Sequence, residues 1–252
     1  MAISKELKDA MVFLRLSGIL PTLEERISYA NAKKITIVEF LEMIFYDELE
    51  RRQTKLLNLK MKKAGVEANL EVYDWDTTTA YDRELVRDLF SLNFIEEHHS
   101  VLAFGSTGTG KTFLARHLAF SALKAGHTVM FCRSDKMFKH LKLSGFDGTR
   151  DRAMGQYIRA CLLIIDDFAV KEMTREEADI VYEIVLERYG KKSTIITSAR
   201  SPEEWQALFP DPIIGNSVLD RLCHSSYQVE MTGPSLREQN KPYKKYSSLK
   251  KK

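Results

Sequence analysis

Apolar residues recur at intervals of three or four along the first quarter of the chain, which predicts helices. Ser4 is a typical N-cap for the first helix, and a break near Gly18 separates it from a second helix that starts near Thr22. Thr36 caps a third and longer helix, which we expect to end at Gly65. The apolar positions of this long helix are Phe40, Leu41, Ile44, Phe45, Leu49, Leu56, Leu57 and Met61.

From residue 81 onward the pattern is different. One amphipathic helix is predicted over residues 81–97, and short apolar runs then alternate with longer amphipathic stretches. Runs of this kind are typical of strands buried on both faces, and the stretches between them are long enough for crossover helices. Residues 145–155, which include three glycines, are expected to form a surface loop. The predicted strands are residues 101–104, 129–132, 162–165, 194–197 and 227–231.

These elements predict an α/β protein with a small helical domain at its N-terminus. Residues 1–66 are assigned to the all-α domain, residues 67–80 to a linker, and residues 81–233 to a parallel sheet of five strands with flanking helices. Residues 234–252 form a basic tail, and a segment of about twenty residues after the last strand is too short for a full helical lid.

Composition and the N-terminal sequence indicate where in the cell the protein is expected. Apolar residues make up 44% and charged residues 29% of the chain, and no stretch has the eighteen or more apolar residues of a membrane span. The N-terminus has no apolar region followed by a small-residue cleavage site. We therefore expect a cytoplasmic protein without a membrane partner.

Residues 105–112, Gly-Ser-Thr-Gly-Thr-Gly-Lys-Thr, match the phosphate-binding loop G-x-x-x-x-G-K-[ST]. The motif lies between a predicted strand and a predicted helix, where a cradle for the phosphates of ATP belongs. Lys111 would reach the β- and γ-phosphates, and Thr112 would offer its hydroxyl to Mg²⁺. A purely structural glycine turn is the alternative. The predicted cradle consists of Gly105, Ser106, Thr107, Gly108, Thr109, Gly110, Lys111 and Thr112.

A second motif follows the third predicted strand, which ends in Asp166 and Asp167. A buried strand that ends in two carboxylates is typical of the Walker B motif of P-loop proteins. In this interpretation Asp166 holds Mg²⁺ and Asp167 orients the attacking water. A strand that merely ends in an acidic turn is the alternative, and the phosphate-binding loop earlier in the chain argues against it.

Three further positions are candidates for the same site. At the end of the fourth predicted strand, either Thr197 or Ser198 would place a hydroxyl close to the γ-phosphate or would serve only as a cap, and Ser198 is the residue that we assign. Arg221 precedes the fifth strand and Arg237 follows it. In a P-loop oligomer an arginine at such a place can reach a phosphate, although most helical arginines are simply solvated.

A basic face is predicted on the long N-terminal helix. At 100° per residue Arg51, Lys55 and Lys62 fall on one stripe, with Arg52 and Lys63 to one side. Such a stripe suits contacts to DNA phosphates, which give affinity without sequence readout. The alternative is a solvated helix face. A second basic cluster, at the end of the chain, consists of Lys241, Lys244, Lys245, Lys250, Lys251 and Lys252.

The order of these motifs resembles the IstB family of transposition helper ATPases, which is similar to the DnaC-type helicase loaders within the AAA+ class. The resemblance covers nearly the whole chain. Beyond the phosphate-binding loop it rests on residues 39–41, 47–52, 73–75, 163–168, 187–190, 197–198, 202–205 and 220–222.

This resemblance implies an ATPase that uses ATP and Mg²⁺, assembles on duplex DNA as a homo-oligomer with ATP sites between subunits, remodels the DNA and recruits or activates a transposase. It implies that Arg221 acts as a finger on a neighbour's ATP, that Arg237 senses phosphate, and that Tyr73 and Trp75 lie near the adenine; packing in a buried linker is the alternative for both aromatic residues.

The chain departs from the family pattern at two positions. Asp167 stands where most relatives have glutamate, and Ala199 stands where asparagine is usual, which raises the question of how fast ATP is hydrolysed. A loader of a replicative helicase would share every ATPase residue and is the first alternative function. A nucleotide-gated binding module with negligible turnover is the second.

Overall fold

The structure is a computed structural model that describes residues 3–67 and 79–239. It divides into two compact units, Met1–Lys60 and Met61–Lys252. The predicted linker, residues 67–80, and basic tail, residues 234–252, fall largely outside the described residues. No helix within the described ranges is both long and apolar enough to cross a membrane.

The first unit contains α1 (Lys5–Phe13), α2 (Leu23–Lys33) and most of α3 (Ile37–Ala64). The hydroxyl of Ser4 accepts a hydrogen bond from the backbone N–H of Leu7, as predicted for an N-cap. Thr36 accepts one from the N–H of Glu39, whose carboxylate accepts one from the N–H of Thr36 in return. The sequence therefore predicted both of these helix starts correctly.

Charged side chains join the helices of this unit in a way that the sequence did not predict. Arg51 lies four residues after Asp47 on the same helix, where an ion pair is possible, but both carboxylate oxygens of Asp47 accept hydrogen bonds from Arg26 of α2, at 2.9 and 2.8 Å. The hydrogen bonds from Arg26 hold the pKa of Asp47 below its usual value. The buried carboxylate of Glu48 pairs with Arg52 at 2.7 Å and also lies 3.8 Å from Arg51.

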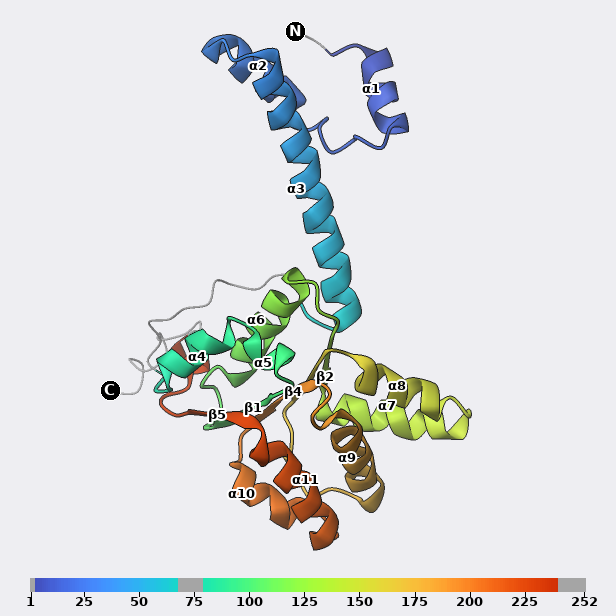
Figure 1. Cartoon of the computed structure of the whole chain (residues 1–252), viewed down its shortest axis with the longest axis vertical. Helices are drawn as coiled ribbons and strands as arrows, with labels where there is room; N and C mark the ends of the chain where they lie inside the picture. The colour runs from blue at the N-terminus through green and yellow to red at the C-terminus, as the bar shows by residue number, and fades with distance from the viewer. Residues whose placement is uncertain (1–2, 68–78, 240–252) are drawn as a thin grey trace, which may run out of the picture. The chain divides into compact units, whose positions relative to one another are not determined.

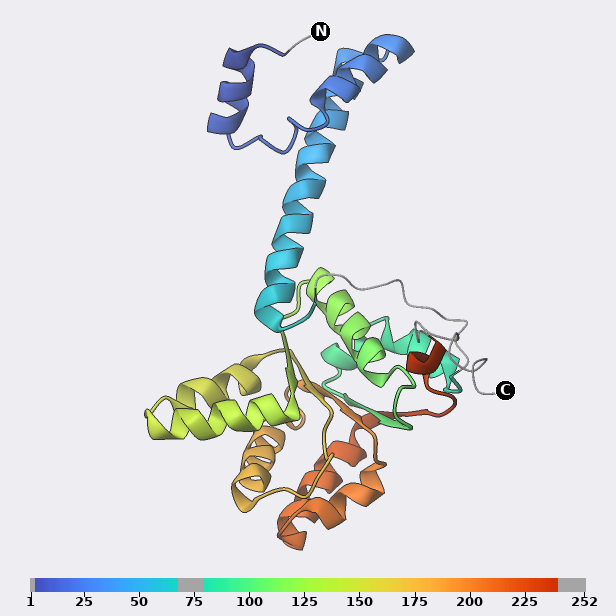
Figure 2. The same ribbon diagram turned by 180° about the vertical axis from the view of Figure 1, so that it is seen from behind.

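The second unit is built on a sheet of five parallel strands in the order β2-β3-β4-β1-β5. Figures 1 and 2 show α4, α5 and α6 on one face of this sheet and α7, α8, α9 and α11 on the other. The predicted fold class and all five predicted strands are confirmed. The strands are β1 (Ser100–Gly105), β2 (Val129–Arg133), β3 (Leu162–Asp166), β4 (Ser193–Ser198) and β5 (Ser226–Met231).

The remaining helices precede, connect or follow these strands. They are α4 (Arg83–Leu89), α5 (Asn93–Glu96), α6 (Lys111–Lys124), α7 (Ser134–Phe146), α8 (Arg150–Arg159), α9 (Arg175–Arg188), α10 (Pro202–Trp205), the 3₁₀ turn η1 (Gln206–Leu208), α11 (Pro212–His224) and α12 (Leu236–Gln239).

Two predictions about these connections were wrong. The single helix expected over residues 81–97 is interrupted at Leu92, whose backbone is left-handed, and forms α4 and α5. The surface loop expected over residues 145–155 is mostly helical, because α7 continues to Phe146 and α8 begins at Arg150. Gly155 lies in α8 close to the Arg159 side chain, so its lack of a side chain allows a close contact inside a helix.

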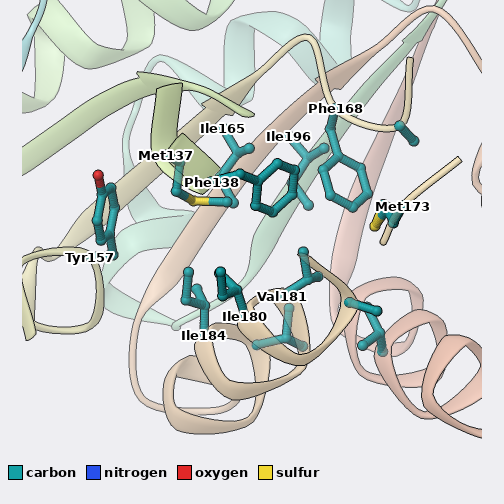
Figure 3. Close-up of a cluster of buried hydrophobic side chains, with 14 of the residues drawn as sticks. Met137, Phe138, Tyr157, Ile165, Phe168, Met173, Ile180, Val181, Ile184 and Ile196 are labelled. Carbon is teal, nitrogen blue, oxygen red and sulfur yellow. The ribbon is translucent and has the colours of Figure 1, made fainter. Parts of the chain in front are cut away.

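The core of this unit lies between the sheet and the helices α7, α9 and α11. Figure 3 shows Ile165 and Ile196 of the sheet facing Ile180 and Ile184 of α9, with Met137 of α7 beside them. Every residue of β3 and β4 is buried, which is typical of parallel strands that have helices on both faces. This packing fixes the strand ends, where the predicted site lies.

Arg188, the last residue of α9, is a buried cation that joins three elements at the amino ends of the strands. Its side chain is 1% exposed and donates to the hydroxyl of Thr194 at 3.0 Å. Burial lowers its pKa to about 10, so the guanidinium is still charged at neutral pH. It also donates to the backbone carbonyl oxygens of Tyr157, Ile158, Ala160, Cys161 and Ser193.

We predict that Arg188→Lys destabilises the protein, because an ammonium group cannot reach acceptors spread around a planar guanidinium. Several buried carbonyl groups would lose their donor, at a cost of about 3 kcal/mol, and thermal unfolding followed by circular dichroism should show a midpoint lowered by about 6–12 °C. The exposed Arg152 of α8 provides the control, since Arg152→Lys should leave the midpoint unchanged. Equal shifts in both variants would contradict the role given to Arg188.

Candidate nucleotide-binding site

The predicted phosphate-binding loop connects the end of β1 to the start of α6. Gly105 has φ = 122° and Gly108 has φ = 85°, both in the left-handed region that favours glycine. A Cβ atom at Gly105 would lie 2.3 Å from the carbonyl oxygen of Met231, and one at Gly108 would lie 2.1 Å from the hydroxyl oxygen of Ser235. The loop therefore packs too closely on the segment after β5 to accept larger residues at these positions.

Lys111 is the first residue of α6, and its amine folds back over the loop. Nζ donates to the carbonyl oxygens of Gly105 at 2.8 Å and Ser106 at 2.6 Å. Burial lowers the pKa of Lys111 below its ordinary value, while the negative charge of Asp167 opposes this shift and the positive charge of Arg237 adds to it. The amine is held by its two hydrogen bonds at the loop where the phosphates of a nucleotide would bind.

Asp166, at the end of β3, lies next to the first turn of α6. Its side chain is buried, and Oδ1 accepts hydrogen bonds from the hydroxyl groups of Thr112, at 2.8 Å, and Thr197. A carboxylate and a hydroxyl in contact are the oxygen ligands that Mg²⁺ prefers. The described residues contain no cluster of three or more histidine, cysteine or acidic side chains that could hold a metal ion, so Mg²⁺ here would also need phosphate and water oxygens.

Asp167 is held mainly through its backbone. Its φ of 54° is left-handed, its N–H donates to the hydroxyl of Thr197 at 3.1 Å, and its carbonyl oxygen accepts from the hydroxyl of Ser134 at 2.7 Å. The carboxylate is half-exposed and lies 3.7 Å from the guanidinium of Arg133 at the end of β2. A water bound near this carboxylate would have a proton acceptor.

The structure brings Thr197, and not Ser198, to the carboxylate of Asp166 and the backbone N–H of Asp167. The hydroxyl of Ser198 donates to the carbonyl oxygen of Phe168 and accepts from the indole N–H of Trp205 and the backbone N–H of Arg200. Of these partners, Trp205 belongs to α10, Phe168 follows β3 and Arg200 lies between β4 and α10. Alternate residues of a strand point to opposite faces, so only one of two adjacent hydroxyl groups can reach Asp166.

Sequence reasoning did not single out Arg133 and Ser134. Arg133 ends β2 and Ser134 follows it, just as Asp166 ends β3 and Asp167 follows it. Parallel strands end at the same edge of the sheet, so the polar residues after every strand were candidates. The sequence carries this signal, because Arg133 and Ser134 are the polar residues after the apolar run of the second predicted strand.

Arg237 lies close to the cradle of its own chain. The N–H of Leu236 donates to the carbonyl oxygen of Gly108 at 2.9 Å, which fixes the segment that carries Arg237 against the loop. On the other side, the hydroxyl of Thr79 donates to the carbonyl oxygen of Thr109 at 3.1 Å. The predicted adenine contacts, Tyr73 and Trp75, lie outside the described residues.

Arg221, in the last turn of α11, lies at the opposite edge of the sheet from the loop. It lines a small cavity together with Ser100 and Thr194, which are at the amino ends of β1 and β4. The loop begins at the other end of β1, after roughly 16 Å of strand. The guanidinium donates to the carbonyl and hydroxyl oxygens of Ser217 one turn earlier, which holds it on the helix surface.

The five predicted DNA contacts on α3 differ in their surroundings. Arg52 and, more weakly, Arg51 are engaged by the buried carboxylate described above. Lys55, Lys62 and Lys63 are exposed, and none of them forms an ion pair with another described residue. The three lysines are therefore the more available phosphate contacts.

Known proteins identify the family. The family of IstB-like ATP binding proteins matches residues 10–244. The chain belongs to this family. This IstB-like chain is 35% identical, over 94% of its length and 95% of the relative's, to a protein described as an ATP-binding protein in an insertion sequence of Mycobacterium tuberculosis. It is 31% identical, over 94% and 90% of the two lengths, to one from insertion sequence IS21 of Pseudomonas aeruginosa.

A solved structure agrees with the fold of the IstB-like chain. The crystal structure of the DnaC helicase loader matches with a TM-score of 0.53 and 20% identity, and the match covers 60% of this chain and 88% of that one. At this identity the likeness concerns the fold alone, a parallel sheet with flanking helices. The family resemblance predicted from the sequence is confirmed.

We predict that Lys111→Ala removes ATP binding by the IstB-like protein. The variant loses the amine that would otherwise contact the β- and γ-phosphates, and two charge-assisted contacts correspond to a loss of affinity on the order of 10²-fold or more. Titration with a fluorescent ATP analogue measures this. Lys124→Ala, at the exposed end of the same helix, should bind as the unmodified protein does, and normal affinity in Lys111→Ala would contradict the assignment.

Proposed function

We propose that this IstB-like protein is an ATPase that assembles on duplex DNA with ATP, remodels it, and recruits or activates the transposase of an insertion sequence. The main support is the group formed by Thr112, Asp166, Asp167 and Thr197 beside Lys111. Relatives described as ATP-binding proteins of insertion sequences supply the biological setting. The proposal that DNA and a transposase are partners rests on the family resemblance, and for DNA also on the basic face of α3.

In the proposed reaction the loop from Gly105 to Thr112 binds the phosphates of ATP, and Lys111 neutralises charge that develops on the transferred phosphoryl group. Mg²⁺, when bound by Thr112 and Asp166, would polarise the phosphate oxygens. Asp167 orients the attacking water and accepts its proton. Thr197 holds the two aspartates in position relative to each other, since its hydroxyl donates to the carboxylate of Asp166 and accepts from the backbone N–H of Asp167.

The two arginines are assigned to different subunits. Arg237 acts on the ATP of its own chain, because its segment is bonded to Gly108. Arg221 acts on the ATP of a neighbouring subunit, because a position at the amino ends of β1 and β4 is beyond the reach of its own loop. ATP would then lie between subunits, and its γ-phosphate would link assembly to hydrolysis.

Duplex DNA is assigned to the basic face of α3. Lys55 and Lys62 are two turns apart on one stripe, Lys63 lies beside them, and all three are exposed. Arg51 extends the stripe, whereas Arg52 serves mainly to neutralise Glu48. Lysines on a helix bind phosphate as mobile point charges, so affinity without sequence preference is expected.

A loader of a replicative helicase is the second candidate function, because the ATPase unit has the fold of the DnaC loader. The two functions differ in the nucleic acid and in the partner. A preference for single strands would favour the loader, and a preference for duplex would favour the transposition helper.

We predict that Arg221→Ala leaves ATP binding intact and lowers hydrolysis on the order of 10³-fold, the loss expected for an engaged arginine finger. Phosphate release and nucleotide titration separate these two effects. Mixing Arg221→Ala with Lys111→Ala should restore activity. In the mixture, Arg221 of a Lys111→Ala subunit can act on ATP bound to the intact loop of an Arg221→Ala subunit. Arg152→Ala, an exposed change on α8, should hydrolyse ATP normally. Failure of the mixture would place Arg221 in its own active site or outside catalysis.

The DNA assignment predicts a change in salt dependence. Each phosphate neutralised contributes about −0.9 to the slope of log affinity against log salt, so Lys55→Gln, Lys62→Gln and Lys63→Gln together should flatten that slope by roughly two to three units. Binding should weaken equally on all duplex sequences. The loss of affinity should be larger than the contacts of a single subunit would produce, because every subunit of the assembly makes the same contacts. Fluorescence anisotropy over a range of salt concentrations measures both effects.

The control for this experiment changes net charge by the same amount elsewhere in the N-terminal helices. Lys5→Gln, Lys8→Gln and Lys33→Gln remove three exposed charges from α1 and α2. If both triple variants flatten the slope equally, overall charge and not the face of α3 governs binding. If the slope of the α3 variant is unchanged, that face is merely solvated.

A further inference from the structure

The conformation of Asp167 is unusual for a residue with a side chain. Its φ of 54° lies in the left-handed region, where a non-glycine residue is strained by about 1–3 kcal/mol. Such a conformation persists only where neighbouring groups hold it. Two hydrogen bonds do so: the N–H of Asp167 donates to Thr197, and its carbonyl oxygen accepts from Ser134.

Packing does not replace these bonds. The side chain of Asp167 is 52% exposed and borders an open cavity of about 470 Å³, which is also lined by Ser134, Phe138 and Met173. The carboxylate could therefore move without meeting other atoms. Its contact with Arg133 is an exposed ion pair at 3.7 Å, and such pairs contribute little, about 0–1 kcal/mol.

Ser134, by contrast, is anchored in the core. It is 8% exposed and is the first residue of α7, whose Met137 and Leu141 are fully buried against the sheet. The bond from its hydroxyl to the carbonyl oxygen of Asp167 measures 2.7 Å. A shift of about 1 Å in α7 would lengthen it beyond hydrogen-bonding range.

We propose that Ser134 is a positioning residue for Asp167, and that helix α7 thereby controls the rate of ATP hydrolysis. The inference rests on the proposed function, in which Asp167 orients the attacking water. When the bond is present, the peptide of Asp167 is fixed from both sides and the carboxylate faces the water. When the bond is lost, the peptide relaxes and the carboxylate turns away from the water, so turnover falls without a change in nucleotide binding.

Steady-state kinetics test the catalytic part. Ser134→Ala should lower kcat about tenfold, which corresponds to about 1.4 kcal/mol, and should leave KM and ATP affinity unchanged within about twofold. Ser134→Thr keeps the hydroxyl and should retain most of kcat. Ser144→Ala is the matched control: Ser144 is a buried serine of the same helix, 4% exposed, whose hydroxyl donates to the carbonyl oxygen of Leu141.

Hydrogen exchange followed by mass spectrometry tests the positioning part without relying on hydrolysis. In the nucleotide-free protein, peptides covering residues 166–170 should exchange faster in Ser134→Ala than in the unmodified protein or in Ser144→Ala. If the unmodified protein hydrolyses no ATP, the proposed function fails, while the exchange measurement still decides whether Ser134 holds Asp167.

Three results would overturn the inference. The first is an unchanged kcat in Ser134→Ala. The second is a loss of kcat that Ser144→Ala shows as well, or that Ser134→Thr does not restore, since each of these results indicates general destabilisation. The third is unchanged exchange over residues 166–170, which would show that Thr197 alone is sufficient to hold Asp167.

Discussion

Oδ1 of Asp166 accepts hydrogen bonds from Thr112 and Thr197, and this shared acceptor brings together three segments that are far apart in the sequence. A carboxylate that is 3% exposed must have its charge compensated by donors, so the start of α6 and the end of β4 cannot move away from β3 at low cost. Thr197 extends the same network to the backbone of Asp167. The phosphate loop, the residues proposed to bind Mg²⁺ and the residue proposed to orient water are thus parts of one polar cluster at the carboxyl edge of the sheet.

The amino edge of the sheet has its own buried charge. Arg188 neutralises no carboxylate among the described residues; its guanidinium instead satisfies backbone carbonyl groups at the end of α8 and around the starts of β3 and β4. Carbonyl groups at the end of a helix carry partial negative charge, which a buried cation can compensate. The strands β3 and β4 are therefore fixed at one edge by an anion and at the other by a cation, with apolar packing between them (Figure 3).

The sheet and the phosphate loop were predictable because each depends on local pattern. Five apolar runs gave five strands, and the spacing of Gly105, Gly108 and Lys111 is fixed by the phosphates that the loop surrounds. Contacts that depend on tertiary geometry were not predictable. Asp47 had candidate partners on its own helix and on another, and the packing of α2 selected Arg26. Similarly, the face of β4 that meets Asp166 decided between Thr197 and Ser198, and the register of β2 against β3 placed Ser134 beside Asp167.

The placement of Arg221 at one edge of the sheet and of the phosphate loop at the other has a consequence for assembly. If Arg221 completes a neighbour's site and the subunits add head to tail, each contact joins two different surfaces, the loop of one subunit and the Arg221 surface of the next. An open chain of any length then has one terminal loop without an arginine. The fraction of competent sites would rise with every subunit added, so a short chain would be proportionally less active than a long one or a closed ring. The rate of ATP hydrolysis per subunit would therefore increase with the number of subunits in the assembly.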